Sequence, residues 1–108
     1  MNSRTRPLIS IVTVVYNGIE FIEESILSVV SQTYRNIEYI VIDGGSTDGT
    51  IDILRKYDDY ITYWASEKDK GMYDALNKGF NKATGDIFAY INSDDLYESH
   101  YTIEKIVN

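Results

Sequence analysis

Blocks of apolar residues alternate with polar stretches along the chain, and this pattern predicts strands separated by helices. Runs that are rich in β-branched and apolar residues and end in turn-forming residues are typical of buried strands. Such runs cover residues 8–16, 37–42, 60–65 and 86–91. The run Ile-Phe-Ala-Tyr-Ile at residues 87–91 is apolar throughout, so we expect its strand to be buried on both faces. We expect the third strand to lie nearer an edge of the sheet.

Between these runs, apolar residues recur three and four positions apart, which is the spacing of amphipathic helices. The clearest stripe comprises Met72, Ala75, Leu76, Gly79, Phe80 and Ala83, and an earlier stripe comprises Ile19, Ile22, Ile26, Val29 and Val30. A short helix carries Ile51, Leu54 and Tyr57, with Ser46 or Thr47 as the expected cap, and a last helix covers residues 99–107. Alternation of this kind predicts one α/β domain over residues 1–108. Its sheet should be mostly parallel, with strand order 3-2-1-4 and helices on both faces.

Polar residues follow three of the predicted strands at the point where each strand ends. Tyr16 and Asn17 close the first strand, Asp43 closes the second, and residues 92–95 (Asn-Ser-Asp-Asp) close the fourth. The carboxyl ends of parallel strands meet at one edge of a sheet, and open α/β sheets bind ligands there, at the point where the strand order reverses. We therefore expect these three strand ends to line one crevice between the first and fourth strands.

The adjacent carboxylates Asp94 and Asp95 suggest a metal site. Two like charges side by side repel each other unless a cation lies between them, and oxygen ligands suit a hard divalent ion. The alternative is an Asx-rich turn in which Asp95 caps the next helix. These residues alone favour neither reading, but the convergence of three polar strand ends favours a ligand site.

Charge and composition limit the classes of partner. The net charge of −7 argues against nucleic acid, whose backbone is bound through Lys and Arg. The chain has no cysteine, which excludes thiolate metal sites and cysteine nucleophiles. Neither G-x-x-x-x-G-K-[ST] nor G-x-G-x-x-G occurs, so a metal is the expected counterion for any bound diphosphate. Without a membrane-length apolar run or a signal-peptide core, the sequence fits a cytoplasmic protein.

Four motifs in order resemble the inverting glycosyltransferases of family 2, which have the GT-A fold. They are PLISIVTVVYN at residues 7–17, SQTY at 31–34, IVIDGGSTDGT at 40–50 and DALNKGFNKATGDIFAYINSDD at 74–95. The stretch SEKDKGMYDALNKG at residues 66–79 resembles a branch of bacterial enzymes that build surface polysaccharides and lipid-linked glycans. The resemblance implies a UDP-sugar donor, Mg²⁺ or Mn²⁺ as cofactor, and a glycan or lipid-linked acceptor, with peripheral association at the inner face of the membrane.

The resemblance also implies roles for individual residues. Tyr16 and Asn17 match the family's first nucleotide contacts. Residues 92–94 occupy the family's D-x-D motif, in which the first position faces the ribose and the last position faces the metal. Here the first position is Asn92, which can bind a ribose hydroxyl but adds no charge. Metal binding would therefore depend on Asp94, with support from Asp95.

The sequence departs from the family pattern after the second strand, where Gly44 stands in place of a second aspartate. The carboxylate that we expect to hydrogen-bond the nucleobase is therefore Asp43, with Asp69 as the second candidate. Asp69 lies between Lys68 and Lys70, and this charged run is either a solvated segment or a loop over the crevice.

A general base for the acceptor hydroxyl is not identifiable in the sequence. We therefore expect that the chain is truncated before an acceptor-binding half, and that by itself it binds the donor without transferring sugar. Apolar surface should then be left on the open edge of the fourth strand or on Ile103, Ile106 and Val107, which would favour a homodimer. A non-catalytic nucleotide-sugar-binding module stays open as the alternative. A receiver-type phosphotransfer domain is disfavoured, because such domains place aspartates after the first strand.

Overall fold

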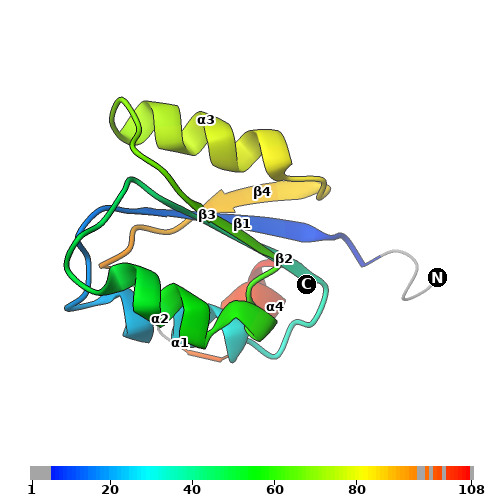
Figure 1. Ribbon diagram of the computed structural model, residues 1–108. Coiled ribbons are helices and arrows are strands. Elements are labelled where there is room, and N and C mark those ends of the chain that lie inside the picture. Colours follow the sequence, from blue (N-terminus) through cyan, green and yellow to red (C-terminus); the bar gives the residue numbers. More distant parts are fainter. Residues whose placement is uncertain (1–5, 95–96, 98, 101, 108) are drawn as a thin grey trace.

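The computed structural model describes residues 6–94, 97, 99–100 and 102–107. The strands are β1 (Ile9–Val15), β2 (Ile37–Asp43), β3 (Tyr63–Ser66) and β4 (Ile87–Tyr90). The helices are α1 (Ile22–Val30), α2 (Thr50–Lys56), α3 (Met72–Lys82) and α4 (Thr102–Val107), with a short 3-10 helix at Asp58–Tyr60. The four strands form a parallel sheet in the order β3-β2-β1-β4, as predicted. Figure 1 shows this sheet between two layers of helices.

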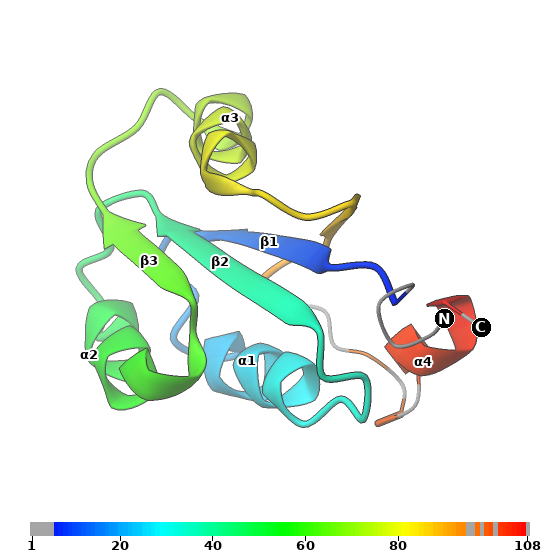
Figure 2. The ribbon, with the colours of Figure 1, turned by 90° about the vertical axis from the view of Figure 1, so that its right-hand side faces the viewer.

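The two faces of the sheet carry two separate apolar cores, because successive side chains of a strand point to opposite faces. On one face, Ile9, Ile11 and Val15 of β1 belong to the core that also includes buried residues of α1, α2 and α4. On the other face, Val12 and Val14 belong to the core formed with α3. Figure 2 shows α3 on one side of the sheet and α1, α2 and α4 on the other side. The prediction of helices on both faces is therefore confirmed.

Helix α3 packs closely on the sheet at Gly79. A Cβ atom on Gly79 would lie 2.5 Å from a methyl carbon of Val12 in β1, which is closer than real side chains approach. The glycine therefore lets the helix backbone lie against the middle of the central strand. This packing fixes the position of the loop that precedes α3, which contributes residues to the cavity described below.

Strand β4 is exposed, and the prediction that it is buried on both faces is wrong. Ile87 is 43% exposed, Phe88 is 53% exposed and Tyr90 is 37% exposed. The reason is position: among the described residues, β4 pairs only with β1 and forms an edge of the sheet. Phe88 is partly covered by Phe80 of α3, with the two rings stacked 5.7 Å apart between centroids.

The ends of three elements differ from the sequence-based expectation. The third strand begins at Tyr63 rather than residue 60, because residues Asp58–Tyr60 form a 3-10 turn. The last helix begins at Thr102 rather than residue 99. Helix α2 begins after Gly49, without a side-chain cap from Ser46 or Thr47.

Helix α4 covers the core instead of exposing it. Ile103, which we expected at an apolar surface, is only 3% exposed and belongs to the core beneath the sheet. Val107 is half-buried against the same core, and the side chain of Ile106 lies outside the described residues. None of the described helices has the length and apolar character required to cross a bilayer.

Candidate functional site

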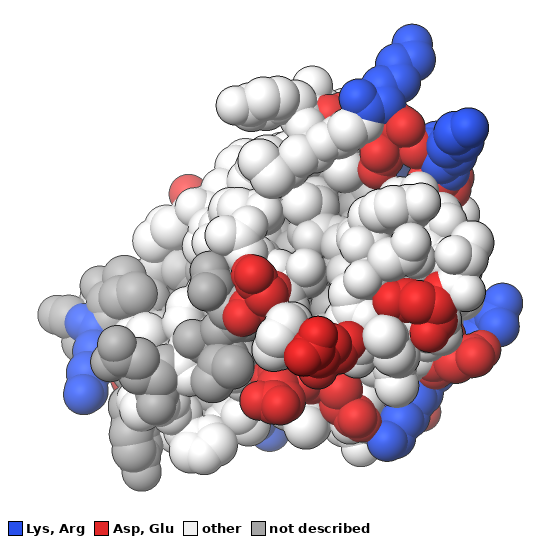
Figure 3. Space-filling view, turned by 90° about the vertical axis from the view of Figure 1, so that its left-hand side faces the viewer, with Lys and Arg blue, Asp and Glu red and all other residues white. Residues whose placement is uncertain are grey.

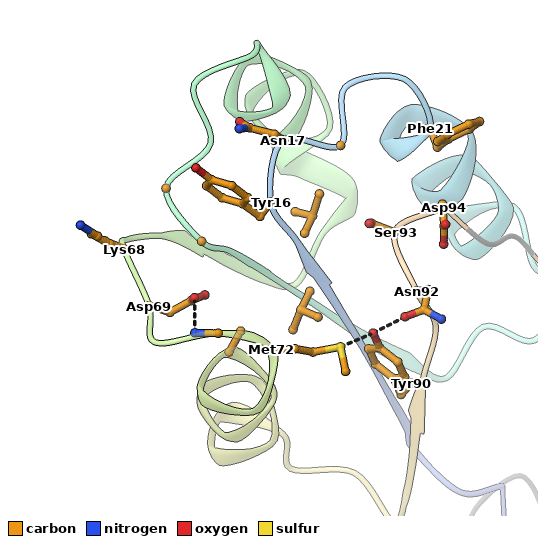
Figure 4. Close-up of a pocket in the computed structure, with 17 residues that line it drawn as sticks. Tyr16, Asn17, Phe21, Lys68, Asp69, Met72, Tyr90, Asn92, Ser93 and Asp94 are labelled. Atoms are coloured by element: carbon orange, nitrogen blue, oxygen red, sulfur yellow. Dashed lines mark hydrogen bonds between the residues drawn. The ribbon is translucent and has the colours of Figure 1, made fainter.

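A cavity of about 910 Å³ opens at the carboxyl edge of the sheet. Its lining comes from the ends of β1, β2 and β4 and from the loop between β3 and α3. The lining residues are Val14, Val15, Tyr16, Asn17, Gly18, Phe21, Gly44, Gly45, Lys68, Asp69, Gly71, Met72, Ala75, Tyr90, Asn92, Ser93 and Asp94. Four of the predicted nucleotide contacts and one predicted metal ligand thus lie around one space (Figure 4). Asp95, the second predicted metal ligand, lies outside the described residues.

The turn after β1 is held by its neighbour, the loop after β2. Asn17 has a positive φ of 49°, a conformation that asparagine tolerates better than most residues. Its backbone N–H donates to the Ser46 hydroxyl at 2.7 Å, and its side-chain oxygen accepts from the Thr47 N–H at 2.8 Å. Tyr16, just before it, is 65% exposed and presents its ring to the cavity (Figure 4).

Asp48 also holds this turn in place, through hydrogen bonds to both loops. Its carboxylate accepts hydrogen bonds from the backbone N–H of Ile19 at 3.0 Å and from the hydroxyl and N–H of Thr50. The Thr50 hydroxyl is the main reason why the pKa of Asp48 is lowered. The Thr50 hydroxyl also accepts from the Gly18 N–H at 3.1 Å. The aspartate in Ser-Thr-Asp-Gly-Thr therefore joins two loops rather than facing a ligand.

Asp43 lies beneath the cavity wall and does not line the cavity. It is fully buried at the end of β2, opposite Val15 and Ser66. Its carboxylate accepts four hydrogen bonds: from the Gly45 N–H at 3.0 Å, from the N–H and hydroxyl of Ser46 at 2.8 and 2.5 Å, and from the Ser66 hydroxyl at 2.7 Å. This arrangement satisfies the hydrogen-bonding capacity of a buried carboxyl group and fixes the shape of the β2–α2 loop.

Asp69 faces the cavity from the β3–α3 loop. One carboxylate oxygen, Oδ1, accepts from the Gly71 N–H at 3.0 Å, which closes a tight turn before α3. Lys68 also lines the cavity, and its side chain points outward in Figure 4. Of the two interpretations of the charged run at residues 68–70, the structure thus supports a loop over the crevice.

Residues 92–94 form the opposite wall. The Tyr90 hydroxyl donates to the Asn92 side-chain oxygen and also lies 3.8 Å from the Met72 sulfur. Ser93 faces the β1–α1 turn, where a Cβ atom on Gly18 would lie 3.6 Å from its hydroxyl oxygen. Asp94 is exposed at the rim, toward α1 (Figure 4). The sequence did not identify Tyr90 and Met72 as residues that line the cavity, because β4 was expected to be covered.

The electrostatic setting of the cavity is acidic. Figure 3 looks onto this edge of the sheet and shows Asp and Glu side chains gathered across its lower half, with Lys and Arg at the margins. Helix α1 carries Glu23 and Glu24 in its first turn, and Glu23 forms an ion pair with Lys56 at 2.7 Å. Within the described part of the chain, no three His, Cys, Asp or Glu side chains are close enough to hold a metal. A metal bound beside Asp94 would therefore need ligands beyond this one carboxylate, such as phosphate oxygens.

Comparison with known proteins identifies the family. The family model for Glycosyl transferase family 2 matches residues 10–108, which is nearly the whole chain. The chain belongs to glycosyltransferase family 2. This confirms the resemblance read from the four motifs, and it agrees with the position of the cavity at the carboxyl ends of the strands.

Relatives in sequence carry the same family name. The chain is 36% identical over 102 residues to an uncharacterized glycosyltransferase of Mycobacterium tuberculosis, covering 94% of this chain and 39% of the relative. It is 44% identical over 91 residues to one of Rickettsia typhi, covering 84% of this chain and 28% of that protein. The chain thus spans well under half the length of these curated relatives.

Solved structures with the same fold include glycosyltransferases. The mannosyltransferase PcManGT from Pyrobaculum calidifontis, determined in complex with GDP-Man and Mn²⁺, superposes with a TM-score of 0.84 at 28% identity, covering 91% of this chain and 30% of that protein. TarS 1–349 from S. aureus superposes with a TM-score of 0.82 at 25% identity, covering 91% and 30%. The GT-A fold, with its 3-2-1-4 parallel sheet, is thereby confirmed.

Proposed function

We propose that this chain binds a nucleotide sugar in the cavity at the carboxyl edge of the sheet, as the donor-binding part of a metal-assisted glycosyltransferase. The observation that carries the proposal is the cavity itself. Tyr16 and Asn17 lie far from residues 92–94 along the sequence, but all of them line the same cavity. The chain that forms this cavity belongs to a glycosyltransferase family. PcManGT, which shares the fold at 28% identity, binds GDP-Man with Mn²⁺, and this supports a nucleotide-sugar donor here.

The cavity offers different chemistry at its two ends. Tyr16 presents an exposed aromatic ring on which a nucleobase can stack, and Asn17 fixes the turn that carries this ring. Asn92, Ser93 and Asp94 line the other side of the cavity, and we propose that Asn92 binds a ribose hydroxyl there. We propose that the donor lies across the cavity, with its base at the Tyr16 end and its diphosphate at the Asp94 end.

The diphosphate needs a cation, because the chain carries a net charge of −7 and the cavity edge is acidic. Carboxylate and phosphate oxygens are hard ligands that suit Mg²⁺ or Mn²⁺. We propose that Asp94 holds this ion, with Asp95 as a second ligand. When bound, the ion would neutralise charge on the phosphates and on the leaving nucleoside diphosphate.

For the whole enzyme, we propose transfer with inversion to a glycan or lipid-linked acceptor, in bacterial polysaccharide or glycolipid synthesis at the cytoplasmic face of the membrane. In such a reaction, the acceptor oxygen attacks the anomeric carbon and loses its proton to a base, while the bond to the diphosphate breaks. Among the described residues, the carboxylates that line the cavity are Asp69 and Asp94, and both are assigned to the donor. This favours, as the second candidate, a module that binds nucleotide sugars without catalysing transfer.

Calorimetry of the chain with UDP and GDP, with and without Mn²⁺, tests the proposed function. We expect binding that depends on Mn²⁺ and that is weaker in Asp94→Ala, because this substitution removes a proposed carboxylate ligand of the ion. Asp59→Ala removes an exposed carboxylate outside the cavity and serves as the control. Equal affinity in all conditions would exclude the metal assignment. Turnover of a UDP-sugar with an added acceptor would exclude the non-catalytic alternative.

A further inference from the structure

Gly44 and Asp69 lie against each other in the cavity wall, although they come from different loops. A Cβ atom on Gly44 would lie 2.9 Å from Oδ2 of Asp69, 3.3 Å from its carboxyl carbon and 3.4 Å from Oδ1. The Asp69 carboxylate therefore occupies the space that any side chain at position 44 would take. Gly44 directly follows Asp43 at the end of β2, and it lines the cavity while Asp43 does not.

The two carboxylates near this point differ in their freedom to bind a ligand. Asp43 is fully buried and already accepts four hydrogen bonds. Asp69 is half-buried in the cavity wall and uses Oδ1 for the Gly71 N–H. None of the described residues donates a hydrogen bond to Oδ2 of Asp69. Asp69 also lies at the Tyr16 end of the cavity, away from residues 92–94 (Figure 4).

From this geometry we infer that Asp69 reads the nucleobase and that Gly44 is the residue that makes room for it. The inference depends on the proposed nucleotide-sugar function and specifies the class of donor. The base-reading carboxylate comes from the β3–α3 loop and lies over the end of β2, while Asp43 positions the loop beneath it.

The chemistry of a carboxylate defines the bases that fit. An ionised carboxylate only accepts hydrogen bonds, so it favours a base with a ring N–H on its pairing edge. Uracil offers N3–H and guanine offers N1–H. Cytosine and adenine place a lone pair at the corresponding ring position, which repels the carboxylate. The inferred donor class is therefore the sugars carried on UDP or GDP, rather than on CDP or ADP.

The test is the base preference, measured by calorimetry of the 108-residue chain with the four nucleoside diphosphates in Mn²⁺. We expect wild type to prefer UDP to CDP, or GDP to ADP, by about 10- to 150-fold, the range for one charged hydrogen bond. Asp69→Ala should remove most of this preference. Asp59→Ala, the control outside the cavity, should keep it.

Substitution of Gly44 provides a second, independent arm. Gly44→Ala should displace the Asp69 carboxylate and lower the preference, whereas adding Gly44→Ala to Asp69→Ala should lower it no further. The exchange variant combines Gly44→Asp with Asp69→Gly, so that the carboxylate comes from the residue after β2 instead. Part of the base preference that is lost in Asp69→Ala should then return. A general weakening of the fold would change affinity for all four nucleotides alike, so the ratio separates base reading from structural damage.

The outcomes separate this inference from the proposed function. If wild type binds UDP or GDP in Mn²⁺ but Asp69→Ala keeps the full preference, Asp69 does not read the base and the proposed function stands. A wild type that binds UDP and CDP equally, and GDP and ADP equally, would also overturn the inference alone. If wild type binds none of the four, both the inference and the proposed function are wrong.

Discussion

The side-chain oxygen of Asn17 accepts a hydrogen bond from the backbone N–H of Thr47, 2.8 Å away in a different loop. In the opposite direction, the Ser46 hydroxyl accepts from the Asn17 N–H. These two bonds lock the β1–α1 turn to the β2–α2 loop and set the direction of Tyr16. Asn17 thus contributes to the cavity first by fixing its shape, whatever contact it makes with a ligand.

Asn17 contributes to stability through its hydrogen bond to Thr47 and through its tolerance of a positive φ, and two substitutions should separate these contributions. Asn17→Gly keeps the positive φ but loses the bond to Thr47, and we expect it to cost about 0.5–1.5 kcal/mol. Asn17→Ala also forces a side chain with a poor fit into that conformation, and should cost roughly 1–2 kcal/mol more. Urea unfolding measures both. Equal stability of the two variants would show that the backbone conformation carries no cost.

Tyr16 should contribute to nucleotide binding through its ring and not through its hydroxyl. Tyr16→Phe keeps the ring and should bind UDP nearly as wild type does, whereas Tyr16→Ala should lose about 1–3 kcal/mol, the usual value for stacking of one base. Because Tyr16 is 65% exposed, neither change should affect the fold. Calorimetry with UDP in Mn²⁺, after thermal melts of each variant, provides the comparison. Loss of binding in Tyr16→Phe would point to the hydroxyl instead.

Glu38 should make stability depend on pH in the acid range. Burial raises the pKa of Glu38, but the N–H and hydroxyl of Thr84 and the Ser10 hydroxyl, at 2.7–2.8 Å, together lower it below its ordinary value of 4.5. The folded state therefore holds Glu38 ionised at a pH where the unfolded chain takes up a proton. Its contribution is present above pH 4.5 and is lost as the pH falls through the lower, folded pKa.

Urea unfolding of Glu38→Gln between about pH 7 and about pH 3 measures this contribution. The variant should be less stable than wild type at neutral pH, and the difference should shrink on acidification. Glu20→Gln changes an exposed residue at the start of the α1 region and is the matched control. A difference that stays constant with pH would mean that Glu38 is not held ionised by its partners.

The exposed face of β4 leads to a prediction about association. Phe88 is 53% exposed on an edge strand, and such surfaces favour self-association. We expect wild type to dimerise at high concentration in sedimentation velocity, and Phe88→Lys to shift it toward monomer. Tyr60→Lys, on a residue that is 66% exposed beyond the opposite edge of the sheet, should have no effect. A wild type that stays monomeric at all concentrations would contradict the homodimer prediction.

The sequence predicted the alternation of strands and helices from local patterns, and it predicted the sheet order from the topology that such alternation usually adopts. Strand ends such as Tyr16 and Asn92 are visible as breaks after apolar runs, and parallel topology brings them to one edge. The exposure of β4 could not be predicted in this way, because an apolar run looks the same at the edge and in the centre of a sheet.

Contacts between loops could not be predicted from the sequence either. The four donors of Asp43 include Ser66, which reaches it only after β3 pairs with β2. The proximity of Gly44 and Asp69 depends on the same pairing, together with the packing of α3 on the sheet. Both carboxylates are visible as candidates in the sequence, but their different burial decides which one faces the cavity, and burial follows from tertiary structure.

The central position of β1 has a consequence for synthesis of the protein. Ile9 pairs with Ile37 on one side and with Ile87 on the other, so β1 is the first of the four described strands to be made and its second partner, β4, is the last of them. At the usual 5–20 residues per second, a ribosome needs roughly 4–16 seconds to reach β4 after β1 emerges. During that interval the nascent chain presents an unpaired apolar strand edge and has no closed cavity. We expect the ligand site to form only when β4 docks, and the growing polypeptide to depend on chaperones until then.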